Sequence, residues 1–484
     1  MHIKPSKPSL LLIIILIIVS VIFISSLPKR IVHGDDAWFA EQAYWLAKDG
    51  VVRSELFRGR LDYETRQTFY LKLHIWQGAL IALLPNWSIY NFKTISLIYL
   101  SFLLAGLFTI IRRFSSFESP NTYLILLILL LANGYLTEFA FVYRPEVSMS
   151  ALGVWAFYNL LKYLEQNKLH NILISGLLTG LIVLFHLNGI IFVVAGVVLL
   201  IYSRNYKACV YFLVSSGLIS AFYFIDVIYY NDYARFLAQS TYEPGLLDKD
   251  TTFFGFILSF INEPNRYFGH LREGTYSLLM FFVLLMGRKD ILSNKQHKLT
   301  AIYLLALSVT LAFITPGKKP VYLILTMPYF LILVASQFER ILNSGKAPGR
   351  TLVSLSLIYL LANQVFILQK FILHKNNLPR TQHEIITQYK IHNGARIAAP
   401  MSFVFNELPN FSIQEVTSYE IVARLDGDDP SKVDIGAYAK RFEREYIILP
   451  KWYIDDRKIT SNRLSGYVYL GQNHGFYIYK LDNN

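Results

Sequence analysis

The sequence is poor in charge and in cysteine. Only 16% of its 484 residues are Asp, Glu, Lys or Arg, whereas 54% are hydrophobic, and the mean hydropathy is +0.38. Soluble domains carry about 25% charged residues, so the composition excludes a water-soluble fold for most of the chain and predicts that the excess apolar surface faces lipid. Cys209 is the only cysteine, which excludes an intrachain disulfide.

The sequence also lacks the common nucleotide and zinc motifs. It has no Walker motif, no G-x-G-x-x-G, no H-E-x-x-H and no cluster of zinc ligands, which argues against nucleotide hydrolysis within this chain. A net charge of +13 would suit nucleic acid, but its distribution does not: residues 375–484 hold 14 Lys and Arg against 13 Asp and Glu. The remaining positive charge gathers at the ends of apolar segments, which is typical of membrane topology signals.

Long apolar runs are what the sequence has in abundance. A helix needs about 20 apolar residues to cross the hydrocarbon core of a bilayer. Eleven segments are candidate spans: 9–27, 93–111, 121–141, 148–164, 171–187, 189–203, 208–229, 275–287, 300–315, 320–338 and 351–370. Because no small-residue cleavage site follows the run Leu10–Ile24, we expect it to be retained as a signal anchor.

The basic residues predict the orientation of these spans. With the N-terminus in the cytoplasm, every cytoplasmic connection is basic, as the positive-inside rule requires; these connections contain Lys4, Lys7, Arg112, Arg113, Lys162, Lys168, Arg204, Lys207, Arg288, Lys289, Lys295, Lys298, Arg340, Lys346 and Arg350. Lys29, Arg30, Lys318 and Lys319 run against the rule. We therefore expect a multi-pass protein of the inner (plasma) membrane whose C-terminal part is extracytoplasmic.

The predicted fold class is mostly α. Residues 1–374 would form a polytopic bundle with a long first outer loop, 28–92, in which Asp36–Lys48 and Phe69–Leu84 are interfacial or re-entrant helices. Residues 375–484 would form a small α+β domain, since strand-like runs alternate with polar turns; these runs are Arg396–Ala399, Tyr446–Leu449, Tyr467–Leu470 and Phe476–Leu481.

Ionisable residues gather on the predicted outer side, where they could form a site. The acids are Asp35, Asp36, Glu41 and Glu146, and the cations are Lys72 (with His74), Arg144, Lys318 and Lys319. Carboxylates suit a general base, and cations suit a phosphate group. A site with both would activate a hydroxyl acceptor while holding a phosphate leaving group.

Each of these residues also has an ordinary structural explanation. Asp35 or Asp36 would cap a helix, and Glu146 after Pro145 suits the first turn of one. Lysines before a span bind anionic headgroups. His186 is readily explained as a buried, hydrogen-bonded residue, and Asp226 as a helix-packing or solvated one.

Five short motifs carry a resemblance to a known family. The order and spacing of residues 8–370 resemble the membrane glycosyltransferases of the C superfamily, in particular the protein-mannosyltransferase and aminoarabinose-transferase group, which includes the Rgt-type lipopolysaccharide core transferases. Asp35-Asp36-Ala-Trp-Phe-Ala40 resembles the Asp-Glu-Ala-x-Tyr-Ala of that family. Phe69-Tyr-Leu-Lys-Leu-His-Ile-Trp76 resembles Lys-Pro-Pro-Leu-x-x-Trp, and Arg144-Pro-Glu146 resembles Arg-x-Asp or Arg-Pro-Asp. Leu184-Phe-His-Leu-Asn-Gly189 stands in the place of Thr-Lys-Gly, and Gly317-Lys-Lys-Pro-Val-Tyr322 with Met327-Pro328 resembles Lys-x-x-x-Tyr-x-x-x-x-x-Pro.

The resemblance implies transfer of a sugar from a polyprenyl-phosphate donor to an extracytoplasmic acceptor such as lipopolysaccharide, a lipid or a protein. It implies that Asp35 is the base with Asp36 beside it, and that Glu146 is the second acid. Lys72, Lys318, Lys319 and Tyr322 would hold the donor phosphate, with Arg144, His186 and Glu41 in support. The sequence departs from the family at Leu73-His74 (Pro-Pro), Glu146 (Asp) and His186 (Lys).

Two other functions are open from the sequence. A lipid or sugar transporter or flippase would carry inverted repeats and ionisable residues at mid-membrane depth, and a non-catalytic envelope-assembly protein could share the fold. The sequence assigns no cofactor, although the paired outer acids could hold a divalent cation. It does not identify the sugar, the acceptor, the length of the lipid, the role of the C-terminal domain or the oligomeric state.

Overall fold

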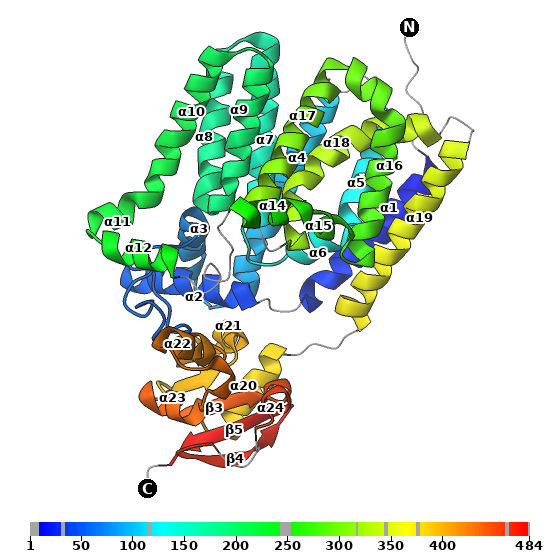
Figure 1. Cartoon of the computed structure of the whole chain (residues 1–484). Coiled ribbons are helices and arrows are strands. Elements are labelled where there is room, and N and C mark those ends of the chain that lie inside the picture. Colours follow the sequence, from blue (N-terminus) through cyan, green and yellow to red (C-terminus); the bar gives the residue numbers. More distant parts are fainter. Residues whose placement is uncertain are drawn as a thin grey trace.

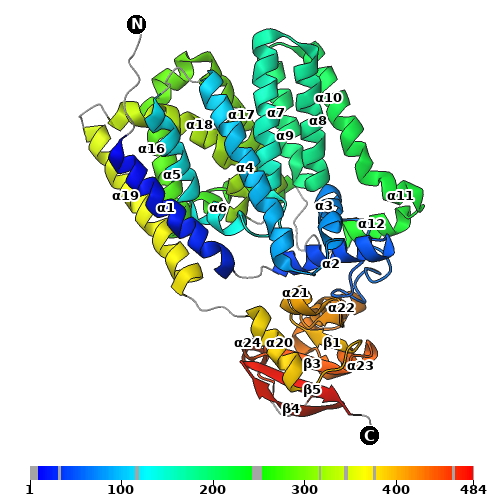
Figure 2. The same cartoon turned by 180° about the vertical axis from the view of Figure 1, so that it is seen from behind.

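The computed structural model describes residues 9–30, 34–114, 119–242, 253–315, 318–342, 347–373, 378–459 and 464–482. A large bundle of helices lies at one end of the molecule and a small sheet covered by short helices lies at the other (Figures 1 and 2). Each of the eleven segments predicted to span the membrane is helical. The corresponding helices are α1 (Leu10–Ser26), α4 (Ile89–Phe114), α5 (Pro120–Leu131) with α6 (Gly134–Phe139), α7 (Glu146–Gln166), α8 (Leu169–Phe185), α9 (Ile190–Tyr202), α10 (Tyr206–Ser220) with α11 (Ile225–Tyr229), α16 (Leu271–Ser293), α17 (Lys295–Ile314), α18 (Leu323–Leu342) and α19 (Ala347–Ile367).

Several of these helices can cross a bilayer. Five described segments are long and apolar enough, namely Ile89–Phe114, Tyr206–Tyr229, Lys295–Ile314, Pro320–Leu342 and Ala347–Phe371. Large apolar side chains stand exposed on the rim of the bundle, for example Leu10 (72%), Leu218 (65%) and Leu361 (64%). In water such a surface would be unfavourable, whereas lipid tails solvate it. The chain is therefore an integral membrane protein.

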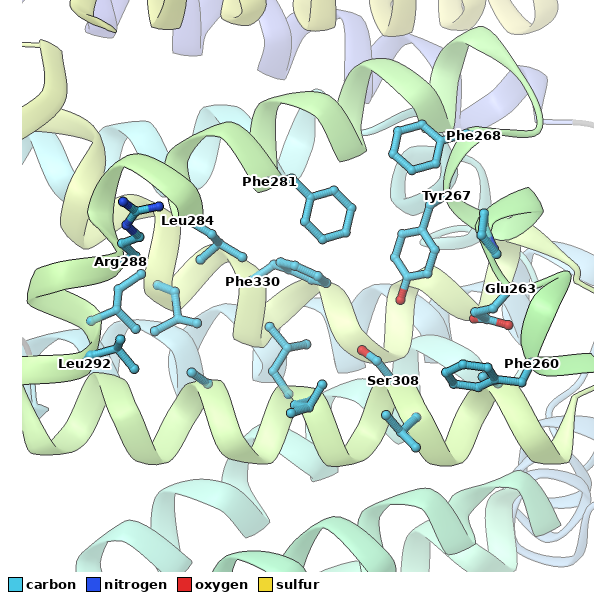
Figure 3. A pocket seen from close by; sticks show the side chains of 18 of the residues that line it. Phe260, Glu263, Tyr267, Phe268, Phe281, Leu284, Arg288, Leu292, Ser308 and Phe330 are labelled. Atoms are coloured by element: carbon cyan, nitrogen blue, oxygen red, sulfur yellow. The ribbon is translucent and has the colours of Figure 1, made fainter. Parts of the chain in front are cut away.

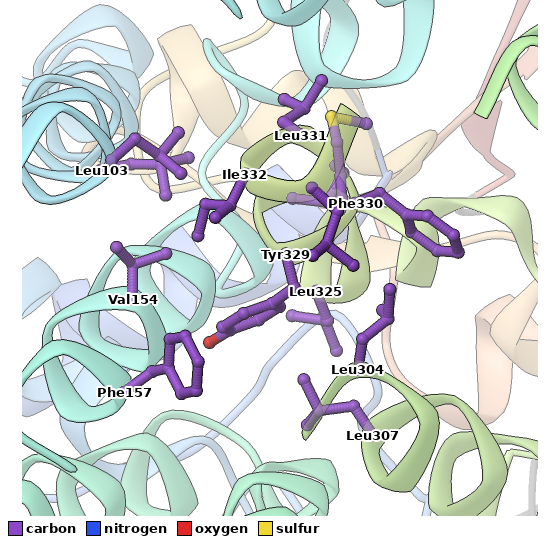
Figure 4. Close-up of a cluster of buried hydrophobic side chains, with 14 of the residues drawn as sticks. Leu103, Val154, Phe157, Leu304, Leu307, Leu325, Tyr329, Phe330, Leu331 and Ile332 are labelled. Carbon is purple, nitrogen blue, oxygen red and sulfur yellow. The ribbon is translucent and has the colours of Figure 1, made fainter. Parts of the chain in front are cut away.

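Helix α18 is the centre of the bundle. It packs against α5, α7, α16 and α17, and nearly all of its residues are buried. The ring of Tyr329 lies 5.0 Å from that of Tyr303 and 5.3 Å from that of Phe157. Leu325 and Leu304 belong to the same buried cluster (Figure 4). Pro328 sits inside α18; such a proline is tolerated where neighbouring helices enclose the backbone.

The third predicted span differs from a single helix. Residues 121–141 break into α5 and α6 because Asn133 caps the second helix: its side chain accepts hydrogen bonds from the backbone N–H of Tyr135 and Leu136. The chain then turns at Tyr143–Pro145 into α7, which begins at Glu146. This turn places Arg144 at the end of the bundle that faces the sheet.

Two further helices lie between the bundle and the sheet (Figure 1). Helix α2 (Gly34–Asp49) and helix α3 (Lys72–Ala82) confirm the two helices expected in the segment 28–92, and they pack against each other. Shorter helices connect the later spans: α12 (Tyr233–Thr241), α14 (Phe253–Ile261) and α15 (Pro264–Phe268).

The C-terminal residues form a five-stranded mixed sheet of order β2-β1-β3-β5-β4. Strand β1 (Arg396–Ala399) pairs in parallel with β2 (Ser412–Glu415) and β3 (Tyr446–Pro450), and β5 (Phe476–Leu481) pairs antiparallel with β3 and β4 (Tyr467–Asn473). The strands predicted from sequence are confirmed, but β2 was missed because Ile413 is the only apolar residue among its four, whereas β1 has three. The helices around the sheet are α20 (Leu378–Gln388), α21 (Val404–Glu407), α22 (Ser418–Asp426), α23 (Ile435–Arg441) and α24 (Lys451–Arg457).

The sheet is docked on the segment that follows α2. The Glu415 N–H donates to the Leu56 carbonyl at 3.0 Å, and the Gln414 amide donates to the Arg58 carbonyl at 3.0 Å. The Trp87 indole donates to the Val404 carbonyl at 2.9 Å. The ends of the parallel strands thus fix the loop between α2 and α3.

Candidate active site

A cavity of about 260 Å³ lies at the start of α2, and we call it the α2 cavity. Six parts of the chain enclose it: α2, the segment 63–71, the turn before α7, the turn after α8, the turn of residues 221–224 after α10 and the segment before α18. Its lining residues are Asp35, Trp38, Phe39, Gln42, Tyr63, Gln67, Phe69, Tyr70, Leu71, Arg144, Pro145, His186, Leu187, Tyr223, Lys319 and Tyr322.

Asp35 and Arg144 form the charged centre of the α2 cavity. Asp35 stands in the first turn of α2 and pairs with the Arg144 guanidinium, and its side chain is 38% exposed. The same guanidinium donates to both carboxylate oxygens of Glu146, at 2.6 and 3.1 Å. Burial would lower the pKa of Arg144, but the adjacent Glu146 carboxylate holds it above its usual value. One cation therefore bridges two acids, of which only Asp35 lines the cavity.

Asp36 lies on the other side of α2 and is fully buried. It accepts a hydrogen bond from the backbone N–H of Tyr143 and lies 3.5 Å from the Lys93 ammonium. Asp36 thus ties α2 to α4 and to the turn that carries Arg144. This contact fixes the position of Arg144 relative to Asp35.

Glu41 holds the loop that follows α2. Its carboxylate accepts from the Ser54 hydroxyl at 2.6 Å and from the backbone N–H groups of Glu55 (2.6 Å) and Leu56 (3.1 Å). Burial raises its pKa to about 7, against these hydrogen bonds. Since Leu56 also meets Glu415, Glu41 belongs to the contact between the loop and the sheet.

The four predicted phosphate ligands divide into two pairs. Lys319 and Tyr322 line the α2 cavity, and Lys319 is exposed. Lys318 turns away from it, to Glu263 at 2.9 Å and the Ser259 hydroxyl at 3.0 Å. Lys72 is buried beside the cavity and pairs with Asp226 at 2.6 Å.

Asp226 and His186 lie next to these predicted ligands. Asp226 is the partner of Lys72 and joins α11 (Ile225–Tyr229) to α3, as expected for a helix-packing residue. His186 lines the cavity, and its Nδ1 accepts the Asn188 N–H at 3.0 Å, which confirms the expected hydrogen bond. The residue is partly exposed and not buried as expected.

The structure thus brings together five of the predicted site residues: Asp35, Arg144, His186, Lys319 and Tyr322 line one cavity. The other five lie around it with partners inside the protein: Asp36, Glu41, Lys72, Glu146 and Lys318.

Sequence reasoning missed Arg266, which supports the segment before α18. Arg266 is fully buried, pairs with Glu263 at 2.6 Å and donates to the Lys319 carbonyl at 3.0 Å and the Thr315 hydroxyl at 2.6 Å. Pro264 opens a short helix and places the acid and the arginine three residues apart, a signal that the sequence did contain.

A second hollow, of about 700 Å³, lies between α14, α15, α16, α17 and α18, and we call it the α16–α17 groove. Figure 3 shows Glu263 near one end and Arg288 near the other, with Phe281, Leu284 and Phe330 between them. Almost all of its lining side chains are apolar. Since Glu263 binds Lys318, the segment 318–322 connects this groove to the α2 cavity.

Among residues 9–30, 34–114, 119–242, 253–315, 318–342, 347–373, 378–459 and 464–482, no three His, Cys, Asp or Glu side chains are grouped as ligands of a metal ion. The divalent cation left open by the sequence has no such ligand set in this part of the chain.

The comparison with solved structures decides the fold. The chain is similar to ArnT from Cupriavidus metallidurans bound to undecaprenyl phosphate, with a TM-score of 0.62, 11% identity and 97% of each chain covered. This chain has the fold of the C-superfamily membrane glycosyltransferases. The chain is also similar to AglB, the oligosaccharyltransferase of Archaeoglobus fulgidus, in complex with an inhibitory peptide and a dolichol-phosphate. That comparison has a TM-score of 0.53 and 10% identity, and it covers 97% of this chain and 74% of AglB.

The resemblance predicted from five short motifs is therefore confirmed at the level of the fold. No protein-family model matches the chain, and no curated protein matches its sequence. The C-superfamily fold was thus visible in the order of a few charged motifs and in the structure, but not in overall sequence similarity.

Proposed function

We propose that this chain is a glycosyltransferase that moves a sugar from a polyprenyl-phosphate donor to a cell-envelope acceptor, such as lipopolysaccharide, a lipid or a protein. One observation carries the proposal: a carboxylate, Asp35, and an exposed lysine, Lys319, line a single cavity, and the segment of that lysine continues to a large apolar groove. A transferase of this kind needs a base, a phosphate-binding cation and a place for a lipid tail.

The proposed membrane arrangement follows from the positive-inside rule. Residues 1–374 form the transmembrane domain with eleven spans, and the N-terminus is cytoplasmic. The α2 cavity and the domain of residues 375–484 are then extracytoplasmic, with α2 and α3 at the interface. The protein resides in the inner membrane.

Asp35 is the proposed general base. The acceptor hydroxyl oxygen attacks the anomeric carbon of the donor, the bond from that carbon to the phosphate oxygen breaks, and the hydroxyl proton passes to Asp35. The lipid phosphate leaves with the bonding electron pair. A direct displacement needs one base and inverts the anomeric centre.

Arg144 and its second acid, Glu146, position this base. Glu146 is almost fully buried and accepts hydrogen bonds from two nitrogens of the guanidinium. These bonds fix the orientation of the Arg144 guanidinium relative to Asp35. Asp36 fixes the neighbouring turn through the Tyr143 N–H. His186 and Tyr322 complete the wall of the cavity.

Lys319 is the proposed first contact of the donor phosphate, because it lines the α2 cavity and is exposed. Lys318 and Lys72 join it by exchanging Glu263 and Asp226 for phosphate oxygens, since an ammonium group retains a negative partner in either state. The polyprenyl tail lies in the α16–α17 groove, where apolar side chains face it.

The test is sugar transfer in proteoliposomes. Polyprenyl-phosphate sugars and cell-envelope acceptors are supplied to the parent, to Asp35→Asn and to Asp456→Asn, which removes an exposed acid far from the cavity. We expect transfer by the parent and by Asp456→Asn, and a loss of about 10²–10⁴-fold with Asp35→Asn. Absence of transfer with every donor, or equal rates in all three proteins, would contradict the proposal.

A further inference from the structure

One face of α2 carries polar and aromatic groups into the α2 cavity. Asp35, Trp38 and Gln42 follow one another at spacings of three and four residues, which places them on the same face of a helix. All three line the cavity. The base proposed above therefore stands in a row with an indole and an amide.

Three polar atoms of the cavity wall are buried without a hydrogen-bond partner among the described residues. They are Oε1 of Gln42, Oε1 of Gln67 and Nε1 of Trp38. Gln42 is 1% exposed and Gln67 is 2% exposed. Leaving such groups unpaired is costly, so the cavity is built for a ligand that completes them.

The geometry fixes what this ligand must offer. The Gln67 amide donates through Nε2 to the Phe69 carbonyl at 3.2 Å, which leaves Oε1 as an acceptor. With the Gln42 oxygen and the Trp38 N–H, the wall supplies two acceptors and one donor. A ligand with several hydroxyl groups meets all three, because each hydroxyl both donates and accepts.

The rest of the wall suits the ring of a sugar. Aromatic side chains from the segment 63–71 line the cavity beside the amides, namely Tyr63, Phe69 and Tyr70. Apolar walls with a few polar groups are typical of sites for small organic ligands. The C–H faces of a sugar ring pack on aromatic rings while its hydroxyls point to the edges.

The charges of the cavity argue against a cationic amino sugar. Asp35 shares Arg144 with Glu146, and Glu41 is enclosed by the Ser54–Leu56 segment. Lys319 adds a further positive charge to the lining. The ammonium group of an amino sugar would be repelled by Arg144 and Lys319, whereas the uncharged amides of Gln42 and Gln67 suit the hydroxyl groups of a neutral sugar.

We propose that Gln42, Gln67 and Trp38 bind the hydroxyl groups of the transferred sugar, and that they select a neutral sugar over an amino sugar. This inference rests on the proposed function, because it identifies the sugar class that the same site takes. The two amides act as specificity residues and take no part in the proton transfer.

The first experiment measures binding and needs no transfer. The detergent-solubilised protein is titrated with polyprenyl-phosphate mannose and, separately, with polyprenyl phosphate. We expect the parent to bind the glycosylated lipid at least tenfold more tightly, and Gln42→Leu or Gln67→Leu to lose about threefold to tenfold of that preference each. Gln77→Leu is the control, since Gln77 also has an unpaired amide oxygen but does not line the cavity.

The outcomes separate this inference from the proposed function. Equal affinity of the parent for the two lipids, or unchanged preference in both variants, would overturn the inference and would mean that the amides hold only water. A sugar preference that is lost in the variants while no donor supports transfer would uphold the inference and refute the reaction.

A second experiment reverses the selection. Gln42→Glu keeps an acceptor oxygen and adds a negative charge, so we expect it to shift the ratio of affinities for polyprenyl-phosphate arabinose and aminoarabinose toward the amino sugar by at least tenfold. If a folded Gln42→Glu protein keeps the ratio of affinities of the parent, the sugar does not contact Gln42, and the proposed role of Gln42 as a specificity residue is wrong.

Discussion

The α2 cavity and the α16–α17 groove differ in almost every physical property, although a single segment, 318–322, joins them. The cavity is small, about 260 Å³, and concentrates charges and buried amides; the groove is about 700 Å³ and nearly free of polar atoms. A soluble substrate would need only the α2 cavity, and an apolar lipid would need only the α16–α17 groove. Together they match a molecule with a polar head and a long tail.

The acids of the molecule show a second contrast. Asp35 and Glu146 are held by the Arg144 cation, whereas Glu41 and Glu415 are buried among neutral donors. Burial raises the pKa of each of these two to about 7. Asp35 and Glu146 therefore have a cationic partner, whereas the acids that hold the loop and the sheet have raised pKa values.

Removal of the shared cation should have the largest effect. In Arg144→Met the buried Glu146 carboxylate loses its partner, so we expect a loss of about 3–5 kcal/mol of stability, measured by thermal unfolding in detergent. The double variant Arg144→Met/Glu146→Gln should regain most of that stability without regaining sugar transfer. Recovery of transfer in the double variant would show that Arg144 has a structural role only.

The carboxyls without a cation should make stability depend on pH. The folded protein binds the Glu415 proton more tightly than the unfolded chain, whose glutamates titrate near 4.3. This contribution is complete below that value and is lost as the pH rises through about 7, by up to about 4 kcal/mol. Hydrogen exchange in β1 and β2 at pH 5.5 and pH 8 should show faster opening at pH 8.

Glu415→Gln removes this titrating group and is the matched variant. We expect its exchange rates in β1 and β2 to change much less between the two pH values. An unchanged pH dependence in Glu415→Gln would assign the effect to another group.

Filling the groove should weaken lipid binding without touching the cavity. Ala301 lines the α16–α17 groove and is partly exposed, so Ala301→Trp should raise the KM for a long-chain donor about tenfold and leave that for a short-chain donor near the parental value. The control is Val365→Trp in a different apolar groove, between α16 and α19. Equal effects of the two substitutions would mean that the α16–α17 groove does not bind the lipid tail.

The smallest expected effect concerns Lys72. Asp226→Asn removes the negative partner of the Lys72 ammonium. A bound phosphate would then supply that negative charge, so we expect about threefold tighter binding of polyprenyl phosphate. Weaker binding in a folded Asp226→Asn protein would mean that Lys72 supports the structure and does not meet the phosphate.

The sequence predicted the elements of the fold well because apolar periodicity and basic flanks are local signals. All eleven segments are helical, and α2 and α3 lie where Asp36–Lys48 and Phe69–Leu84 indicated. The break at Asn133 and the strand β2 were missed, since a cap within an apolar run and a strand with a single apolar residue leave little periodic pattern.

The site was only partly predictable from the sequence. Charged residues near a membrane are conspicuous, so Asp35, Arg144 and Lys319 were found. Their partners were not, because Lys72 meets Asp226 across 154 positions of sequence and Lys318 meets Glu263 across 55. Gln42 and Gln67 carry no charge and belong to no motif, and only burial makes them noticeable.

Photo-crosslinking tests most directly whether the cavity and the groove form one site. The probe is a polyprenyl phosphate with a diazirine at the far end of its tail, and mass spectrometry locates the label. We expect labelled peptides from the α16–α17 groove, around Leu284 and Leu305, and loss of the label in Ala301→Trp. Label concentrated around Phe366, in the groove between α16 and α19, and retained in Ala301→Trp would contradict it.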